Sequence, residues 1–253
     1  MSPKSFYRIL AACILVIAII VYGRYFYPSL WENIGKKHLS SNTSVNQISS
    51  DSNYKNAPLF ELPIFGPINA KLSIDVLSDY ACGWSRQYYQ DTIKPFVDNY
   101  LSKYDVNIKY DMVSYEGSPS LLATEAIHCG VEVYGSEYFW PLHSALFSLA
   151  EEGDLETQFS RENIIQIIKE IHVDNSSGDA HIEDFIKCLD SHKYRNYILE
   201  RFKDYVGAYN NLGFPTTFLN GQPMQMMIEG KMQTVGAVSL EDFIKIIEQK
   251  LNL

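Results

Sequence analysis

One cysteine of this chain stands where redox chemistry is favoured. Cys82 opens the segment Cys82-Gly83-Trp84-Ser85, directly after the strand-like run Leu72 to Ser78 and at the start of an amphipathic stretch. Unpaired backbone N–H groups and the helix dipole stabilise a thiolate at the start of a helix, and the thiolate is the nucleophile of thiol–disulfide exchange. The order strand, cysteine, helix therefore predicts a reactive thiol, with a small buried residue at a helix start as the alternative.

The other cysteines limit what Cys82 can pair with. Cys13 lies inside an apolar N-terminal run, which leaves Cys82, Cys129 and Cys188 for the soluble part of the chain. In an oxidising compartment, three cysteines give one disulfide and one free thiol. The sequence contains no C-x-x-C or H-x-x-x-H cluster with metal-ligand spacing, so we expect neither a metal nor a cofactor.

Length and charge restrict the function classes. The chain has 253 residues and a formal net charge of -9. That length accommodates one good-sized domain with a buried core. The acidic balance argues against a nucleic-acid partner, because no basic stripe is present to release counterions from phosphates.

The N-terminus predicts attachment to a membrane. After a short tail (residues 1–8), residues 9–27 contain fifteen uncharged residues from Ile9 to Gly23, followed by Arg24 and three aromatic residues. Fifteen helical residues rise about 22 Å against a hydrocarbon core of about 30 Å, so a span needs the flanking aromatic residues at the interfaces. A cleaved signal peptide fits the same length, but no A-x-A site follows. Lys and Arg counts do not decide the orientation. Residues 28–56 are largely polar, rich in Ser and Asn toward their end, and predict a flexible linker.

Residues 57–253 predict one α/β domain. Leu72 to Ser78 and Val106 to Val113 have strand character, and the helical stretch between them, kinked at Pro95, makes a βαβ unit. Helical patterns then fill residues 118–212. The chain closes with a strand, a tight turn, a returning strand and a helix, at Thr216 to Leu219, Asn220-Gly221, Met224 to Ile228 and Leu240 to Leu251. This order predicts a thioredoxin fold with an inserted helical subdomain.

Five segments, read together, resemble the DsbA-like thioredoxin-fold family of thiol:disulfide interchange proteins. They are GPINAKLSIDVLSDYACGWS, TEAIHCG, SEYFWPLHSALF, KCLDSHKY and GFPTTFLNG. In that family the first segment carries an active-site Cys-x-x-Cys after an aspartate–aromatic pair, which Asp79-Tyr80 matches. The resemblance covers residues 64–250 and implies that Cys82 is the catalytic cysteine.

The resemblance also assigns a substrate-binding loop. Gly213-Phe214-Pro215-Thr216 matches the family loop whose proline is cis and lies against the active-site cysteine. A cis Pro215 would leave the backbone of Phe214 free to pair with an extended substrate, whereas the alternative is an ordinary turn proline. Trp84 is then either an exposed substrate contact or a lid on the thiol.

Cys129 and Cys188 stand where the resemblance suggests a structural disulfide. Such a bond would stabilise the helical insert by about 2–4 kcal/mol. Two buried free thiols, or a cysteine that resolves Cys82 in a regulatory cycle, are the alternatives.

Two departures from the family change the expected chemistry. Ser85 replaces the second active-site cysteine, so no vicinal disulfide can form. The acidic residue usual six positions before the cysteine is Val76, and Asp75, one place earlier, faces the other side of a strand. Neither residue is expected to shuttle protons for Cys82. A single thiolate still forms mixed disulfides that a second thiol such as glutathione releases, and Ser85 is expected to donate a hydrogen bond to that thiolate.

Other polar and sulfur-containing residues receive plainer interpretations. We expect His128 on a helix surface and His143 in the core beside Trp140. The methionines near the C-terminus predict edge packing, with a soft surface for unfolded clients as the alternative. They are Met224, Met226, Met227 and Met232.

These observations lead to one principal functional hypothesis. The chain is expected to be a thiol–disulfide oxidoreductase, an isomerase or monothiol reductase, acting on exported proteins with cysteines from a single-pass membrane anchor on the extracytoplasmic side. Glutathione or a membrane redox partner would supply thiols. The alternatives are a non-catalytic chaperone or binding module that has lost redox turnover, and a structural, membrane-anchored assembly factor.

Overall fold

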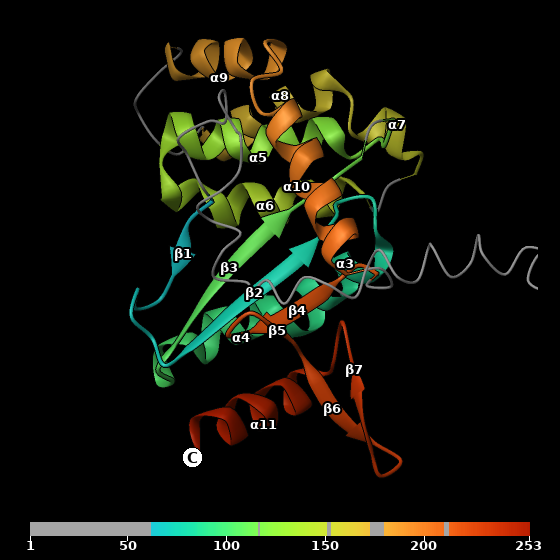
Figure 1. Cartoon of the computed structure of the whole chain (residues 1–253). Coiled ribbons are helices and arrows are strands. Elements are labelled where there is room, and N and C mark those ends of the chain that lie inside the picture. Colours follow the sequence, from blue (N-terminus) through green and yellow to red (C-terminus); the bar gives the residue numbers. More distant parts are fainter. Residues whose placement is uncertain (1–61, 116, 151–152, 173–179, 210–212) are drawn as a thin grey trace, which may run out of the picture. The chain divides into compact units, whose positions relative to one another are not determined.

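The structure is a computed structural model that describes residues 62–253, except 116, 151–152, 173–179 and 210–212 (Figure 1). The predicted tail, membrane segment and linker, residues 1–8, 9–27 and 28–56, lie outside the described residues. Within the described ranges, no helix is both long and apolar enough to cross a membrane.

A five-stranded sheet in the order β1-β3-β2-β4-β5 forms the centre of the described part. Strands β2 and β3 pair in parallel with Leu72 opposite Val106, which confirms the predicted βαβ unit. Strands β1 and β4 flank them in antiparallel orientation, and β5 pairs antiparallel with β4. The strands are β1 Ile64–Phe65, β2 Leu72–Ser78, β3 Val106–Met112, β4 Thr216–Leu219 and β5 Gln222–Pro223.

The two faces of this sheet are covered by different helices. Alternate strand residues such as Ile74 and Tyr110 are buried in one large cluster with Phe96 and Phe243, from the helix after β2 and from the C-terminal helix α11 (Leu240–Leu251). The opposite face carries Leu77, Val113 and Phe218, which pack against side chains of α10 (Arg195–Ala208). The sheet therefore lies between two helical layers.

The helix after β2 is not continuous. It consists of α3 (Gly83–Tyr88), a π turn (Tyr89–Ile93), α4 (Lys94–Asn99) and a short 3₁₀ turn (Leu101–Lys103). The π turn directly precedes Pro95, whose ring displaces the backbone of the preceding turn and whose nitrogen cannot donate a hydrogen bond. The kink predicted from Pro95 thus takes the form of a widened turn.

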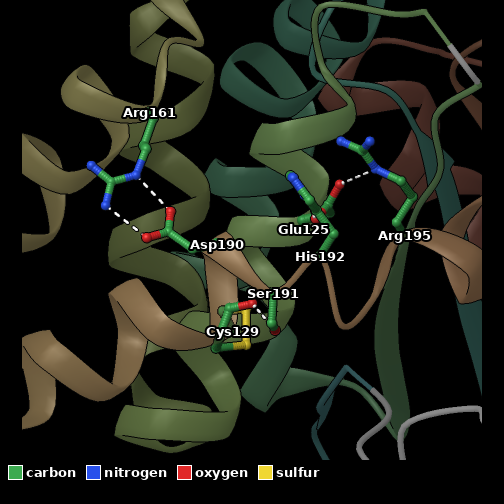
Figure 2. Close-up of polar contacts among 8 residues, drawn as sticks. Glu125, Cys129, Arg161, Asp190, Ser191, His192 and Arg195 are labelled. Atoms are coloured by element: carbon green, nitrogen blue, oxygen red, sulfur yellow. Dashed lines mark hydrogen bonds and ion pairs between the residues drawn. A yellow bond between two sulfur atoms is a disulfide. The ribbon is translucent and has the colours of Figure 1, made fainter.

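The helical insert occupies the predicted part of the chain. Its helices are α5 Leu121–Tyr134, α6 Phe139–Leu149, α7 Leu155–Gln158, α8 Arg161–His172, α9 Ala180–Asp190 and α10, with a 3₁₀ turn at Ser136–Tyr138. A disulfide between Cys129 and Cys188, with a Cα–Cα distance of 5.8 Å, ties α5 to α9 (Figure 2). Around it, the buried carboxylate of Glu125 contacts His192 Nδ1 at 2.8 Å and Arg195 Nε at 2.9 Å.

The surface position expected for His128 is wrong. Its side chain is 3% exposed and its ring stacks on Tyr194 with a centroid distance of 4.9 Å. Helix α5 packs against α6, α8, α9 and α10, so it buries residues on more than one side. Burial lowers the pKa of His128 to about 4, and the imidazole is therefore neutral near pH 7.

The strand expected at Met224 to Ile228 also needs correction. The residues that return along β4 are Gln222–Pro223, and Gln225–Ile228 (β6) pairs instead with Lys231–Thr234 (β7) in a separate two-stranded sheet. Met224 is buried between the two sheets: its N–H donates to Thr217 O, and its carbonyl accepts from Val235 N. Glu229 and Gly230 both have positive φ, as the two-residue turn of a hairpin requires.

Candidate functional site

Cys82 lies between the sheet and the first helix after it. It is the N-cap of α3, its N–H donates to Asp79 O at 3.1 Å, and its carbonyl accepts from Arg86 N at 3.1 Å. The side chain is partly exposed, and the sulfur is the free thiol of the described residues. A nucleophilic sulfur in this position is accessible from solvent.

A loop from the far end of the chain lies against this thiol. The Phe214–Pro215 peptide bond is cis, which confirms the expectation for Pro215. The Cys82 thiol donates to Phe214 O at a sulfur–oxygen distance of 3.4 Å, although the two residues are 132 positions apart. Behind the loop the chain passes closely, because a Cβ on Gly236 would stand 2.1 Å from Pro215 O. The structure therefore brings together Cys82, Phe214 and Pro215 as predicted.

Ser85 lies in the first turn of α3, three positions after Cys82. Its side chain is buried, 1% exposed, and its Oγ has no hydrogen-bond partner among the described residues. Cys82 is here a thiol that donates to Phe214 O, so the hydrogen bond expected from Ser85 to the thiolate stays a prediction. An unpaired buried hydroxyl is costly and rare, so Ser85 carries an unused donor in the first turn of α3.

The aromatic residues around the thiol are exposed or partly exposed. Trp84 is 73% exposed, which fits an open contact surface better than a lid. On the α10 side, Phe214 lies near Phe202 with a centroid distance of 6.4 Å, and Phe202 lies 5.7 Å from Tyr115. Tyr115 is itself 48% exposed. An aromatic row therefore leads from the cis-proline loop across α10.

A buried carboxylate beside Cys82 was missed as a site residue, because Asp79 counted only as a motif match. One carboxylate oxygen accepts from Ala81 N at 2.9 Å and from Ser120 Oγ at 2.6 Å. Ser120 Oγ also lies 3.0 Å from Ser114 Oγ and 2.9 Å from Ser118 Oγ. Burial raises the pKa of Asp79, and the two hydrogen bonds only partly offset this. The serines at 114, 118 and 120 were the feature of the sequence that could have indicated hydrogen-bond donors for this carboxylate.

Tyr80 and His143 lie in the core behind the turn that carries Cys82. Both are fully buried, and Tyr80 Oη lies 2.8 Å from His143 Nδ1. The Tyr80 ring also contacts Phe147 at a centroid distance of 4.9 Å. Burial lowers the pKa of His143 to about 3, so its ring is neutral. The expectation of a core histidine is confirmed.

Asp75 and Val76 occupy opposite faces of β2, as predicted. Val76 is fully buried in the large core cluster. Asp75 belongs to the α10 face: burial raises its pKa first, Lys109 and Arg201 lower it, and Asp111 raises it further. No group of His, Cys, Asp and Glu in the described ranges has the arrangement of a metal site.

A second buried carboxylate lies under α10. Asp111 on β3 forms an ion pair with Arg201 and accepts a hydrogen bond from Tyr205 Oη at 2.7 Å. Burial alone would raise the pKa of Asp111, but Arg201, Lys109 and Tyr205 together hold it below its ordinary value. This carboxylate is therefore ionised near neutral pH.

Comparisons with known proteins place this arrangement in a family. A family model described as thioredoxin matches residues 61–248. The structure is similar to oxidised BdbD from Bacillus subtilis (TM-score 0.57, 21% identity, 76% of this chain and 94% of that chain) and to DsbA from Chlamydia trachomatis (0.58, 11%, 80% and 97%). It is also similar to a reduced disulfide bond oxidoreductase, DsbG, from Mycobacterium tuberculosis (0.54, 18%, 78% and 86%). No curated protein sequence matches. The predicted thioredoxin-like α/β fold with a helical insertion is confirmed.

Proposed function

Because this chain belongs to the thioredoxin family and carries one free thiol beside a cis-proline loop, we propose that it is a thiol–disulfide oxidoreductase that works through Cys82 alone. The contact between Cys82 Sγ and Phe214 O, 3.4 Å, is the observation that carries the proposal. It places the nucleophile beside a backbone segment to which an extended polypeptide can be aligned. The similarity to DsbG, described as a disulfide bond oxidoreductase, supports the same activity.

The reaction needs one thiolate. Cys82 gives its proton to water and attacks one sulfur of a substrate disulfide; a bond forms between Cys82 and that sulfur, and the other substrate sulfur leaves as a thiolate and takes a proton from water. If a different thiolate of the substrate attacks the substrate sulfur of this mixed disulfide, a new substrate disulfide forms, Cys82 leaves as a thiolate, and the net result is isomerisation. If two glutathione molecules resolve the mixed disulfide instead, the substrate disulfide is reduced and glutathione is oxidised to its disulfide.

Four neighbours support these steps. Phe214 O holds the resting thiol, and this hydrogen bond is lost when Cys82 ionises. Ser85 Oγ, a donor without a partner in the described structure, then turns to the thiolate. Trp84, with Phe214 and Pro215, contacts the substrate. Each of these roles belongs to the proposal.

The proposal includes a location and partners. Anchoring by residues 9–27 would hold the domain on the extracytoplasmic side of the cell membrane, where exported proteins with cysteines are the substrates. The Cys129–Cys188 disulfide supports this placement, because disulfides persist in oxidising compartments. Glutathione or a membrane redox partner would resolve the mixed disulfides, and the acidic chain has no role for nucleic acid.

The test is to trap the mixed disulfide. The full chain in detergent micelles is incubated with a peptide that contains one disulfide, quenched with acid, and analysed by mass spectrometry without reductant. We expect peptide attached to Cys82, and none in Cys82→Ala. Absence of the adduct on the wild-type chain, with the Cys129–Cys188 disulfide intact, would remove the catalytic proposal.

A binding module without turnover is the second candidate. It is favoured by Ser85 at the position of a second cysteine and by the exposed side chains of Trp84, Met227 and Met232. It predicts that Cys82→Ala leaves the affinity for an unfolded, cysteine-free polypeptide unchanged, whereas Trp84→Ala weakens it. An oxidoreductase predicts loss of turnover in the first variant.

A further inference from the structure

The turn before Cys82 is organised by a single residue. Asp79 accepts the Ala81 N–H with its side chain, at 2.9 Å, and the Cys82 N–H with its main-chain carbonyl, at 3.1 Å. These two N–H groups are the last ones before α3 begins. Their bonds fix the direction in which the chain enters the helix, and therefore the direction of the Cys82 side chain.

Asp79 is in turn fixed to the helical insert. Ser120, which donates to the Asp79 carboxylate at 2.6 Å, is the N-cap residue of α5, and its carbonyl accepts from Thr124 Oγ1 at 3.0 Å. Ser120 is fully buried. The first turn of α5 and the turn that carries Cys82 thus share one carboxylate oxygen.

This arrangement lowers the stability of the fold, so stability alone does not explain it. Asp79 is 4% exposed, and burial raises its pKa, so the folded state opposes the charge of this carboxylate. Hydroxyl and amide donors surround it instead of a cation: Ser120 and Ala81 directly, with Ser114 and Ser118 behind Ser120. Buried groups that are poorly compensated concentrate at functional sites.

We propose that Asp79 is a positioning residue for Cys82: its carboxylate couples the Cys82 turn to Ser120 and α5, so that the helical insert sets the direction of the thiol toward the Phe214 loop. The inference rests on the proposed function only in taking Cys82 as the reacting thiol. Asp79 itself does not contact the reacting sulfur atoms.

The experiment compares two disulfides as substrates of the full chain in detergent micelles. An extended peptide disulfide has to align with the Phe214 loop, whereas oxidised glutathione makes smaller demands on direction. We expect Asp79→Ala to lower the rate constant of mixed-disulfide formation with the peptide by about tenfold to a hundredfold, as sub-ångström to 1 Å misplacements do. The loss with oxidised glutathione should be clearly smaller.

Two further variants make the result specific. Asp79→Asn keeps an oxygen acceptor for Ala81 and should restore most of the peptide rate. Ser120→Ala removes the link to α5 together with the contacts of Ser120 Oγ with Ser114 and Ser118, so it should give an intermediate loss of the peptide rate and some loss of stability, which the unfolding midpoint measures separately. It also keeps the test decisive if Asp79→Ala does not fold.

Asp111→Asn is the matched control, because it alters a buried carboxylate on β3 that is paired with Arg201 of α10 and lies outside the Cys82 turn. It should lower the unfolding midpoint and leave the ratio of the two rates unchanged. The positioning role is overturned if Asp79→Asn is as slow as Asp79→Ala, if Ser120→Ala has wild-type rates, or if Asp111→Asn changes the ratio equally. A wild-type chain that reacts with neither disulfide would instead overturn the function of Cys82.

Discussion

The two buried aspartates, Asp79 and Asp111, are treated in opposite ways by their surroundings. Asp111 lies under α10 with Arg201 as ion-pair partner and Tyr205 as donor, and its pKa is lowered although burial alone would raise it. Asp79 lies beside Cys82 with only hydroxyl and amide donors, and its pKa is raised. The cost of burying the carboxylate is thus fully offset for Asp111 and only partly offset for Asp79.

The difference separates stability from reactivity within one domain. On the α10 face the buried charge is paired, so it holds α10 on the sheet. In the Cys82 turn the buried charge is tolerated at a cost, which is reasonable where geometry around a reacting atom matters more than stability. Four experiments test whether the two regions differ in this way.

The largest effect is expected from Arg201→Met. This change leaves the Asp111 carboxylate buried without its cation and should lower the free energy of unfolding by about 3–5 kcal/mol. Urea denaturation measures it. Lys245→Met, in an exposed ion pair with Glu241, is the control and should leave the same quantity almost unchanged. Equal losses in the two variants would mean that α10 does not depend on this pair.

Removing the insert disulfide should have the next largest effect. The Cys129→Ser, Cys188→Ser double variant opens a link across 59 positions and should lose about 2–4 kcal/mol of unfolding free energy. The rate at which iodoacetamide modifies Cys82 in the folded protein should stay the same, because the contact of Ser120 with Asp79 lies at the other end of α5. A changed Cys82 rate would show that the disulfide region and the thiol are coupled.

The third test uses pH, where the two aspartates predict opposite signs. The raised pKa of folded Asp79 means that the folded state takes up the proton first as pH falls, so the wild type gains stability relative to Asp79→Asn. Because the pKa of Asp111 is lowered in the folded state, its carboxylate stabilises the fold fully at pH values above the ordinary pKa of 3.8. This contribution is lost as pH falls through the pKa of the folded state. The wild type therefore loses stability relative to Asp111→Asn in that acid range.

Urea denaturation of the three proteins at several pH values between 7 and 3 measures both differences. His128 and His143, with pKa values lowered by burial to about 4 and about 3, also destabilise every variant in acid. The contribution of His143 is common to all three proteins and cancels in each difference. That of His128 does not cancel for Asp111→Asn, because Asp111 raises the His128 pKa and its removal lowers that pKa further, which works against the expected Asp111 difference. Differences of the same sign for both aspartates would refute the contrast between the two regions.

The order of the elements and the main site residues could be predicted from the sequence. Both depend on periodicity, on the cysteine count and on short family motifs, which are features of local sequence. Cys82, Phe214 and Pro215 meet as expected, and so do Cys129 and Cys188. The placement of His128 was wrong, since only tertiary contacts decide which sides of α5 are covered. The returning strand was likewise misplaced: by local pattern Met224 to Ile228 could pair with β4, but Gln222–Pro223 takes that place and Gln225–Ile228 pairs with Lys231–Thr234.

Asp79 could not have been identified as a central residue by spacing. Its partner Ser120 is 41 positions away and belongs to the insert, so no local pattern connects them. Spacing was no better a guide for the thiol: the nearby Ser85 was expected to donate to the thiolate, whereas the acceptor of the Cys82 thiol, Phe214 O, comes from the far end of the chain. Long-range contacts therefore decided both hydrogen-bonding patterns around the thiol.

The smallest effect on stability is expected from Ser85→Ala. The Ser85 hydroxyl is buried without a partner in the described structure, so its removal should leave the free energy of unfolding equal or slightly higher. If this donor turns to the Cys82 thiolate during the reaction, the same variant should form the mixed disulfide several-fold more slowly near neutral pH. Ser148→Ala, on the exposed side of α6, is the matched control and should change neither quantity. An unchanged rate in Ser85→Ala would leave Asp79 as the one polar side chain of the turn that acts on Cys82. A slower rate without loss of stability would show that the Ser85 hydroxyl has no hydrogen bond in the resting protein and makes one only when the Cys82 thiolate forms.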